Sequence, residues 1–531
     1  MSPSDALVSQ RERLDTTGVL HLDEIMGGGL PRGSLLLVMG LPGSGKTTLA
    51  SQIAFTAARG GMRVLVLTAL SESTGKLIEH LRAFTFFDQD LIGGPVQFLS
   101  LQGVLAQGLQ ATSKVILDEA RRVRADIILL DGFRGMRSVD TEPQAVREFL
   151  YELGTALSTL QTTTIVTSET DPRDPTFFPE TTTADFILGL HYTLLGVRQV
   201  RAIEVVKART SSPMPGLHAM VLSQDGASVY PQLEERVALE LLGGGAAIQG
   251  GSRVTPEVAI PDPSVSRATF DLPELDAMLA GGLPRATCTL LAGSLGTGKT
   301  LLALYYALAG IRAGERVVFL GFRESRAQLA LAAKSFDIGP DIARALQSEE
   351  DLVFLEMPPI KVNPDILGDR LLAELDRTGA QRLIVDSIAE LERGVVRSGD
   401  PQRLEDYLAA LLLAVRSRQV TALMLKETDK ALAATLDFSS DALSVLAENV
   451  MLMQQVPFGG ELHRILSIIK LRFSEHDPSV REFRIRASDG LQMLRQLESG
   501  PGVLEGIADD QEFATTRRPR PARKSTSQGA S

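Results

Sequence analysis

Short runs of apolar residues alternate along this chain with longer segments in which apolar and polar residues follow a helical period. Short, almost wholly apolar runs rich in Val, Ile and Leu are typical of strands buried on both faces of a sheet. The expected strands lie at 34–39, 63–68, 126–130, 163–167 and 200–206 in one half, and at 287–292, 316–320, 382–385, 421–425 and 465–469 in the other. Because helical segments separate these runs, the pattern predicts α/β domains, each a mainly parallel sheet flanked by helices.

The two halves of the chain repeat one pattern. Residues 28–32 read Gly-Gly-Leu-Pro-Arg, residues 281–285 repeat them, and an apolar run and a glycine-rich loop follow each block. Lys46 and Lys299, in the two loops, are 253 residues apart, and the two blocks have the same spacing. At ~100–200 residues per domain, a chain of 531 residues is too long for one ordinary domain. The predicted organisation is a leader at 1–15, a first domain at 16–242, a Gly/Pro-rich linker at 243–268, a second domain at 269–499 and a disordered basic tail at 500–531.

Composition and charge exclude several classes of protein. Apolar residues at 44% and charged residues at 22% are typical of globular proteins. The net charge of −11 argues against a protein that coats nucleic acid. No apolar run reaches the ~18 residues of a transmembrane helix, and the start lacks the pattern of a secretory signal, so we expect no membrane association. The single cysteine, Cys288, is expected to be a small core residue, and the cytoplasm is the predicted location.

A glycine-rich loop follows the first apolar run of each half. Both loops match G-x-x-x-x-G-K-[ST], in which glycines let backbone N–H groups approach phosphate oxygens and the next helix offers its N-terminal amides. The predicted nucleotide-binding residues are Gly43, Ser44, Gly45, Lys46, Thr47 and Thr48 in the first loop, and Gly296, Thr297, Gly298, Lys299, Thr300 and Leu301 in the second. We expect Lys46 and Lys299 to reach the β- and γ-phosphates of ATP, and Thr47 and Thr300 to bind Mg²⁺.

Acidic residues follow other apolar runs of each half. Asp131 and Asp386 directly close two such runs, where a carboxylate would hold Mg²⁺ or stabilise its ligands. Glu72 and Glu324 come shortly after the strand that succeeds each phosphate loop. A carboxylate at that place could orient or deprotonate the water that attacks ATP. The alternative for these residues is an ordinary polar side chain in a turn.

Late in each half, an apolar strand ends in Lys-x-Arg. The basic residues are Lys207 and Arg209 in the first half, and Lys470 and Arg472 in the second. Strand alternation places both members of a pair on one side. One use for such a pair is to stabilise charge on the γ-phosphate of a neighbouring subunit, as arginine fingers do. The alternative is a solvated strand end.

Taken together, these features resemble the KaiC family of RecA-like ATPases. The most specific stretches are 324–329 (Glu-Ser-Arg-Ala-Gln-Leu) and 469–472 (Ile-Lys-Leu-Arg), and the resemblance covers 16–240 and 269–497. It implies two tandem RecA-like P-loop NTPase domains, homo-hexameric rings of two stacked tiers, and ATP bound between neighbouring subunits. By the same resemblance, the first site comprises Lys46, Thr47, Asp131 and Glu72, the second comprises Lys299, Thr300, Asp386 and Glu324, and the partner subunit supplies Lys207, Arg209, Lys470 and Arg472.

Each half departs from the family at one residue, which comes shortly after the strand that follows the phosphate loop. The family has two consecutive glutamates there, but Ser71 and Arg323 replace the first of each pair. In the second domain that glutamate is thought to be the base for serine/threonine phosphorylation, which an arginine cannot be. The charge of Arg323 could instead bind phosphate.

The segment that the family phosphorylates is also altered. The family carries adjacent Ser and Thr, and counting back from Glu448 places this pair on Ser444 and Val445. Ser439 and Ser440 are further candidates just upstream. The hypothesis of serine/threonine autokinase activity at Ser444 is therefore weakened, and a two-site phosphorylation cycle would lack one of its sites.

Three functions stand as alternatives at this point. The leading hypothesis is a KaiC-like, ring-forming ATPase in signalling, whose ATP state sets ring conformation and the binding of protein partners. A DNA-dependent recombinase or helicase has the same fold, but the candidate pore loops at 133–146 and 389–406 mix arginines with acidic residues, and the net charge is −11. The third function is a scaffold that uses ATP only to assemble.

Overall fold

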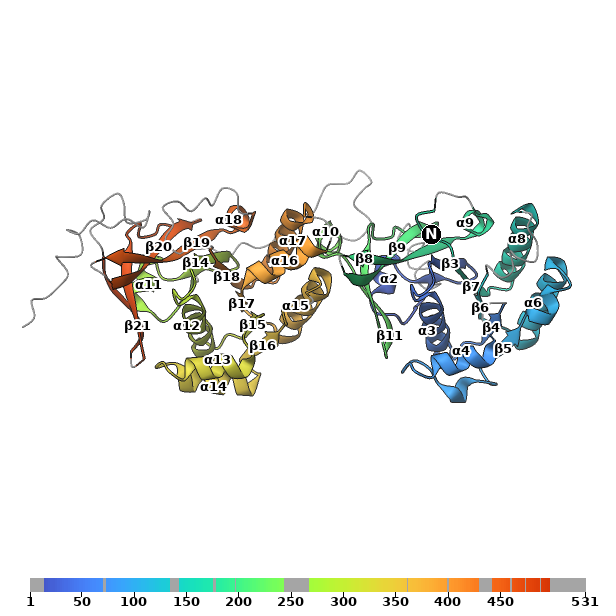
Figure 1. Ribbon diagram of the computed structural model, residues 1–531, viewed down its shortest axis with the longest axis horizontal. Helices are drawn as coiled ribbons and strands as arrows, with labels where there is room; N and C mark the ends of the chain where they lie inside the picture. Colours follow the sequence, from blue (N-terminus) through green and yellow to red (C-terminus); the bar gives the residue numbers. More distant parts are fainter. Residues whose placement is uncertain are drawn as a thin grey trace, which may run out of the picture. The chain divides into compact units, whose positions relative to one another are not determined.

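The computed structural model describes residues 14–496, except for 70–72, 134–142, 175–177, 196, 243–266, 361, 399–400, 429–441, 459–460, 473 and 488. The chain divides into two compact units, Met1–Arg253 and Val254–Ser531, and each is described by itself (Figure 1). Among the described residues, each unit contains a nine-stranded sheet and a two-stranded ribbon. The predicted tail, and the predicted linker except for Arg267 and Ala268, lie outside the described residues.

The sheet of the first unit has the order β11-β10-β9-β8-β3-β7-β6-β4-β5. The six strands from β8 to β5 are parallel, and β9, β10 and β11 extend the β8 edge as antiparallel strands. The bounds are β3 Leu35–Gly40, β4 Val64–Thr68, β5 Val96–Ser100, β6 Ile127–Asp131, β7 Thr163–Ser168, β8 Phe186–Leu195, β9 Arg198–Ala208, β10 His218–Ser223 and β11 Gly226–Tyr230. A ribbon of β1 (Leu14–Asp15) and β2 (Leu30–Pro31) precedes them.

Helices cover both faces of this sheet. The helix bounds are α2 Leu22–Ile25, α3 Lys46–Arg59, α4 Thr74–Leu81, α5 Gln102–Leu105, α6 Leu109–Val123, α8 Pro143–Thr159, α9 Pro179–Thr183 and α10 Leu233–Leu242, with a 3₁₀ turn at Gln89–Leu91. Along β3, Leu36 and Val38 pack in one core with α2, α3 and α4, whereas Leu35 and Leu37 pack in the other with α6 and α8. This alternation explains why the strand is apolar at every position.

The second unit repeats this architecture, in the order β16-β15-β17-β18-β14-β19-β20-β21-β22. The strand bounds are β12 Arg267–Ala268, β13 Leu283–Pro284, β14 Cys288–Gly293, β15 Val317–Gly321, β16 Leu352–Glu356, β17 Arg382–Asp386, β18 Thr421–Glu427, β19 Asn449–Phe458, β20 Glu461–Leu471, β21 Arg481–Arg486 and β22 Gly490–Gln496. The helix bounds are α11 Pro273–Met278, α12 Lys299–Arg312, α13 Arg326–Ala333, α14 Gly339–Ser348, α15 Pro364–Thr378, α16 Ile388–Arg397, α17 Arg403–Ser417 and α18 Ala442–Leu446. The six strands from β16 to β19 in this spatial order are parallel, and β20, β21 and β22 extend the β19 edge as antiparallel strands.

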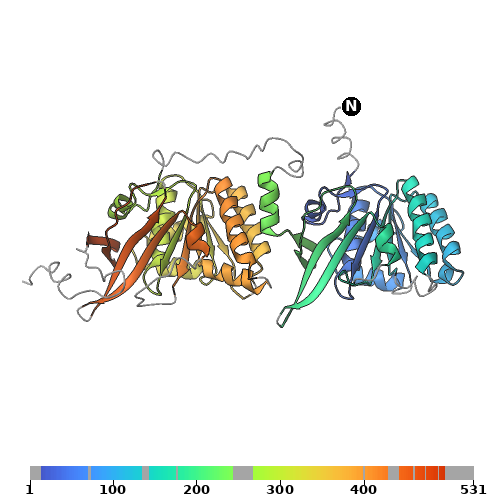
Figure 2. The same ribbon diagram turned by 90° about the horizontal axis from the view of Figure 1, so that it is seen from above.

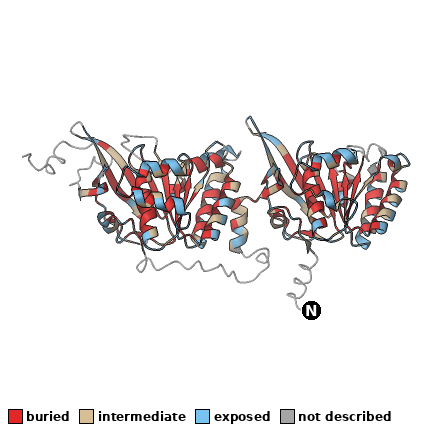
Figure 3. Cartoon of the chain, turned by 90° about the horizontal axis from the view of Figure 1, so that it is seen from below, coloured by how far each residue is buried: buried red, intermediate tan, exposed pale blue. Residues whose placement is uncertain are grey.

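The predicted fold class is confirmed, and all ten predicted strands are present. Eight strands of the two large sheets were missed, namely β5, β8, β10, β11, β16, β19, β21 and β22. The parallel strands in the middle of each sheet are buried, whereas the long antiparallel hairpins β8–β9 and β19–β20 become exposed toward their tips (Figures 2 and 3). Several missed strands, such as β5, β10 and β21, mix buried and exposed positions and lack the continuous apolar run on which the prediction relied. In contrast, β8 and β19 begin with buried apolar runs that the prediction passed over.

Cys288 is buried in β14, as predicted, and burial raises the pKa of its thiol to about 12. The folded protein should therefore resist alkylation by iodoacetamide at pH 8, whereas urea-unfolded protein should react, as intact mass would show. Since the ordinary thiol pKa is about 9, the unfolded chain ionises first. The raised pKa of Cys288 therefore contributes to the free energy of unfolding. This contribution is complete below pH 9 and is lost as the pH rises toward 12. Rapid alkylation of native protein would contradict the buried position.

Within the part of the chain that the structure describes, no helix combines the length and the apolar character needed to cross a bilayer.

Candidate functional site

Each phosphate loop connects the central strand of its sheet to the next helix, so that β3 leads to α3 and β14 leads to α12. Gly45 and Gly298 directly precede the helices with φ angles of 105° and 104°, a left-handed conformation that side chains rarely adopt. Gly293, where β14 ends, passes so close to its neighbour that an added Cβ would lie 2.4 Å from the carbonyl oxygen of Met453. The loops therefore need glycine at these places.

The other predicted loop residues line the turn and the first helical turn. Ser44 and Thr297 are buried within the two loops, and Thr48 and Leu301 are buried in the first turns of α3 and α12. Gly43 and Gly296 have φ angles of 79° and 75°. The hydroxyl oxygens of Ser44 and of Ser294 are buried without a hydrogen-bond partner in the described structure. Such unsatisfied hydroxyls, beside loop amides, fit a phosphate group as the missing partner.

The loop lysines fold back over their own loops. The Nζ of Lys46 donates to the carbonyl oxygen of Leu41 at 3.1 Å, and that of Lys299 donates to those of Gly293 and Ser294 at 2.8 and 2.9 Å. Burial lowers the pKa of both lysines, and nearby carboxylates partly offset this effect. A buried cation held over a glycine-rich loop is suited to bind an anion.

A hydroxyl and a carboxylate meet at the start of each helix. The Oγ1 of Thr47 donates to Asp131 at 3.0 Å, and that of Thr300 donates to Asp386 at 2.6 Å. Burial raises the pKa of both aspartates, and the threonine hydrogen bonds oppose this effect. Adjacent hydroxyl and carboxylate oxygens fit Mg²⁺, which binds few protein ligands and keeps water and phosphate oxygens. No cluster of three or more His, Cys, Asp or Glu that could hold a metal alone occurs among the described residues.

A second acidic residue lies near each phosphate loop and was missed by the sequence analysis. Glu169 follows β7, and Glu427 ends β18, opposite Gly293 in the parallel register. Each carboxylate raises the pKa of the loop lysine in its own unit, Lys46 or Lys299. The available signal was an acidic residue at the end of an apolar run, the same signal that located Asp131.

Of the two glutamates predicted to activate water, one lies among the described residues. Glu72 lies outside the described residues, together with Ser71. Glu324 is described, and burial, together with the negative charge of Asp386, raises the pKa of its carboxyl group. A carboxyl group with a raised pKa near Asp386 is suited to accept a proton.

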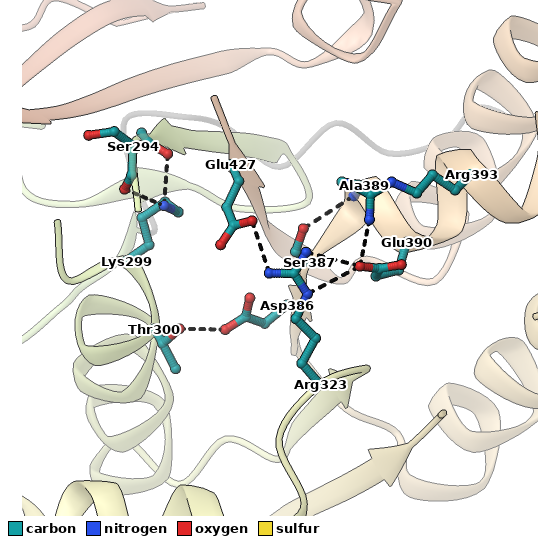
Figure 4. A network of polar contacts seen from close by, with 11 residues as sticks. Ser294, Lys299, Thr300, Arg323, Asp386, Ser387, Ala389, Glu390, Arg393 and Glu427 are labelled. Atoms are coloured by element: carbon teal, nitrogen blue, oxygen red, sulfur yellow. Dashed lines mark hydrogen bonds and ion pairs between the residues drawn. The ribbon is translucent and has the colours of Figure 1, made fainter. Parts of the chain in front are cut away.

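Arg323, which directly precedes Glu324, lies between two carboxylates (Figure 4). Its Nε and Nη2 donate to Glu390 at 3.1 and 3.0 Å, and its Nη1 donates to Glu427 at 2.9 Å. Glu390, in the first turn of α16, also accepts a hydrogen bond from Arg393 at 2.7 Å. The carboxyl end of the second sheet therefore holds a network of two arginines and two glutamates beside Lys299 and Asp386.

In the first unit, the Lys-x-Arg pair lies at the opposite end of the sheet from the phosphate loop. Ala208, between the two basic residues, faces Phe186 in the β-register, and Phe186 faces Leu36, the second residue of β3. The Nζ of Lys207 donates to the carbonyl oxygens of Thr181 and Thr182 at 3.1 and 3.2 Å, and Arg209 pairs with Asp185 at 3.4 Å. The pair therefore does not join the phosphate loop of its own unit.

The second unit has the same arrangement. Lys470 faces Val450, which faces Leu290 in β14, and the Nζ of Lys470 donates to the carbonyl oxygen of Ala447 at 2.6 Å. Arg472 follows β20 and is exposed. Each of the four basic residues is thus placed at the end of the parallel strands that is distant from the phosphate loop.

In the candidate phosphorylation segment, the residue that could carry a phosphoryl group is buried and the residue next to it is exposed. Ser444, in α18, is buried, whereas Val445 is 57% exposed. Ser439 and Ser440 lie outside the described residues. A hydroxyl group at Ser444 would have to move outward to receive a phosphoryl group.

Comparison with known proteins gives one consistent result. The family model described as the KaiC ATPase matches residues 16–234 and 270–498. The circadian clock oscillator protein KaiC 1 of Synechocystis sp. is 25% identical over 520 residues, which cover 94% of each chain. The circadian clock oscillator protein KaiC of Picosynechococcus sp. is 26% identical over 514 residues, again with 94% of each chain covered.

Proposed function

Since this chain belongs to the KaiC family of ATPases, we propose that it binds ATP with Mg²⁺ at both phosphate loops and hydrolyses ATP mainly at the first. The observation that carries this proposal is the repeated placement of a lysine, a threonine and an aspartate around a glycine loop. Lys46 and Lys299 would turn from the loop carbonyls to the phosphates, and Thr47, Asp131, Thr300 and Asp386 would hold Mg²⁺. When bound, Mg²⁺ would neutralise charge on the β- and γ-phosphates.

The two sites differ in the groups that surround the attacking water. In the first site, Glu72 is the proposed water-activating residue, and Glu169 is a second carboxylate near Lys46. In the second site, Glu324 has the raised pKa of a candidate base, but Arg323 adds a positive charge that the family does not have there. We therefore expect slower turnover at the second site.

We further propose that nucleotide lies between subunits of a homo-hexameric ring. Within one chain, the Lys-x-Arg residues and the phosphate loop lie at opposite ends of the parallel strands. Lys207, Arg209, Lys470 and Arg472 would thus act on nucleotide held by a neighbouring subunit. A ring of this kind would change conformation with its ATP state and bind signalling proteins as partners.

Incubation of the purified protein with γ-labelled ATP and Mg²⁺ tests this function, if free phosphate and protein-bound label are separated over time. We expect free phosphate to accumulate and protein-bound label to stay low, because Ser444 is buried and Arg323 cannot serve as the phosphotransfer base. The Ser444→Ala variant should release phosphate at an unchanged rate.

Two outcomes would contradict this expectation. Stoichiometric protein label that disappears in the Ser444→Ala variant would show an autokinase. Absence of both free phosphate and label, despite ATP binding, would leave a scaffold that does not hydrolyse ATP.

A further inference from the structure

Arg323 lies at the meeting point of four strand ends in the second unit. In the parallel register, Gly321 of β15 faces Asp386, Asp386 of β17 faces Leu425, and Glu427 of β18 faces Gly293 of β14. Arg323 follows β15 by two residues. The carboxyl ends of these strands therefore bring Arg323 to the edge of the sheet from which the phosphate loop leaves (Figure 4).

The guanidinium group of Arg323 could leave its two glutamate partners to bind another anion. Its side chain is 44% exposed, and it divides its hydrogen bonds between Glu390 and Glu427. Glu390 is nearly buried, but it retains Arg393 at 2.7 Å if Arg323 departs. Glu427 is 31% exposed and can be solvated. Releasing Arg323 would therefore leave no buried charge without a partner.

We propose that Arg323 is a γ-phosphate-binding residue of the second site, held by Glu390 and Glu427 until ATP arrives, and that it makes this site prefer ATP to ADP. The proposal rests on the proposed function, namely that this loop binds nucleotide. A γ-phosphate placed by Lys299 and Thr300 would enter the space beside Asp386 and Glu427. It would repel Glu427 and attract the guanidinium group, which can donate two parallel hydrogen bonds to phosphate oxygens.

This role is confined to the second site. The corresponding residue of the first half is Ser71, which carries no charge. Glu169 near Lys46 corresponds to Glu427 near Lys299, so this acidic neighbour occurs in both units, whereas the arginine occurs in one. ADP lacks the γ-phosphate, so Arg323 would stay with its glutamates when ADP is bound.

The test measures dissociation constants of ATP and ADP, with Mg²⁺, by calorimetry on the full-length protein. All variants carry Lys46→Ala, so that the second site dominates binding. In this background, Arg323→Ala should weaken ATP binding about ten- to a hundred-fold and change ADP binding about two-fold or less. Arg326→Ala is the matched control, because this arginine lies three residues further on and pairs with Glu349. It should leave the ATP/ADP preference unchanged.

A second variant separates phosphate binding from a general charge effect. Glu427→Gln removes one competitor for Arg323 and also the repulsion between Glu427 and the γ-phosphate, so the ATP/ADP preference should rise several-fold more when Arg323 is present than in the Arg323→Ala background. An equal ATP/ADP preference with and without Arg323 would overturn the role of Arg323 alone. Failure of the Lys46→Ala protein to bind either nucleotide at the second site would overturn the proposed function of that site, and this inference with it.

Discussion

Replacing Lys46 with alanine should reduce steady-state ATP hydrolysis by roughly 10²- to 10³-fold, because it removes a charged donor aimed at the developing phosphate charge. Lys46 is buried at the start of α3, where its ammonium group lies near Asp131 and Glu169. No other described lysine shares its loop. A water molecule in place of the Lys46 ammonium group would carry no charge and would have to reorient as charge develops on the phosphate.

The companion variant, Lys299→Ala, makes the comparison sharper. If the first site performs nearly all of the turnover, Lys299→Ala should leave the hydrolysis rate almost unchanged while it abolishes nucleotide binding at the second site. Lys76→Ala, in the exposed first turn of α4, is the control and should behave as the unmodified protein. Phosphate release by Lys46→Ala at close to the normal rate would refute the assignment of hydrolysis to the first site.

Replacing Arg382 with alanine should destabilise the second unit by about 3–5 kcal/mol, the usual effect of breaking a buried ion pair. Arg382 is completely buried at the start of β17, where its Nε donates to Glu315 at 2.5 Å. Its Nη1 donates to the carbonyl oxygens of Thr269 and Tyr306 at 2.7 and 2.8 Å, and its guanidinium group lies 4.5 Å from the ring centre of Tyr306. The alanine variant would leave Glu315 with Arg285 as its remaining partner, remove a donor from these two carbonyl oxygens and open a cavity.

Alkylation of Cys288 along a urea gradient measures this loss, because the single thiol of the chain is buried in the same unit. Arg377→Ala is a suitable control, since Arg377 pairs with Glu374 on the surface of α15 and its side chain is 63% exposed. Its unfolding midpoint should not move measurably. A midpoint for Arg382→Ala equal to that of the control would show that the buried pair contributes nothing to stability.

The same buried pair predicts a pH dependence. Burial tends to raise the pKa of Glu315, but hydrogen bonds from Arg285 and Arg382 outweigh this effect and lower it. A lowered pKa in the folded state contributes stability that is present above the ordinary value near 4.5 and is lost as the pH falls through the folded value. Arg382→Ala should therefore reduce the loss of stability on acidification.

Sequence reasoning was most effective where function depends on residues close together in the chain. The glycine loop, its lysine and its threonine form one local motif, since the backbone turn and the first helical turn place them together. Asp131 and Asp386 were reached by a slightly longer inference, because a carboxylate that ends a buried strand lies at the edge where parallel strands end. In the structure, these aspartates accept hydrogen bonds from Thr47 and Thr300.

The α/β architecture, its duplication and the position of both phosphate loops could be predicted from the amino-acid pattern, because they follow from apolar periodicity and local backbone geometry. Only the tertiary structure revealed that Glu427 and Glu390, more than sixty residues from Arg323, hold its guanidinium group. It also showed that Ser444 is buried and Val445 exposed. Such facts depend on which strands are neighbours and on how a short helix packs. These arrangements are set by the folding of distant segments onto one sheet, and no local pattern in the chain encodes them.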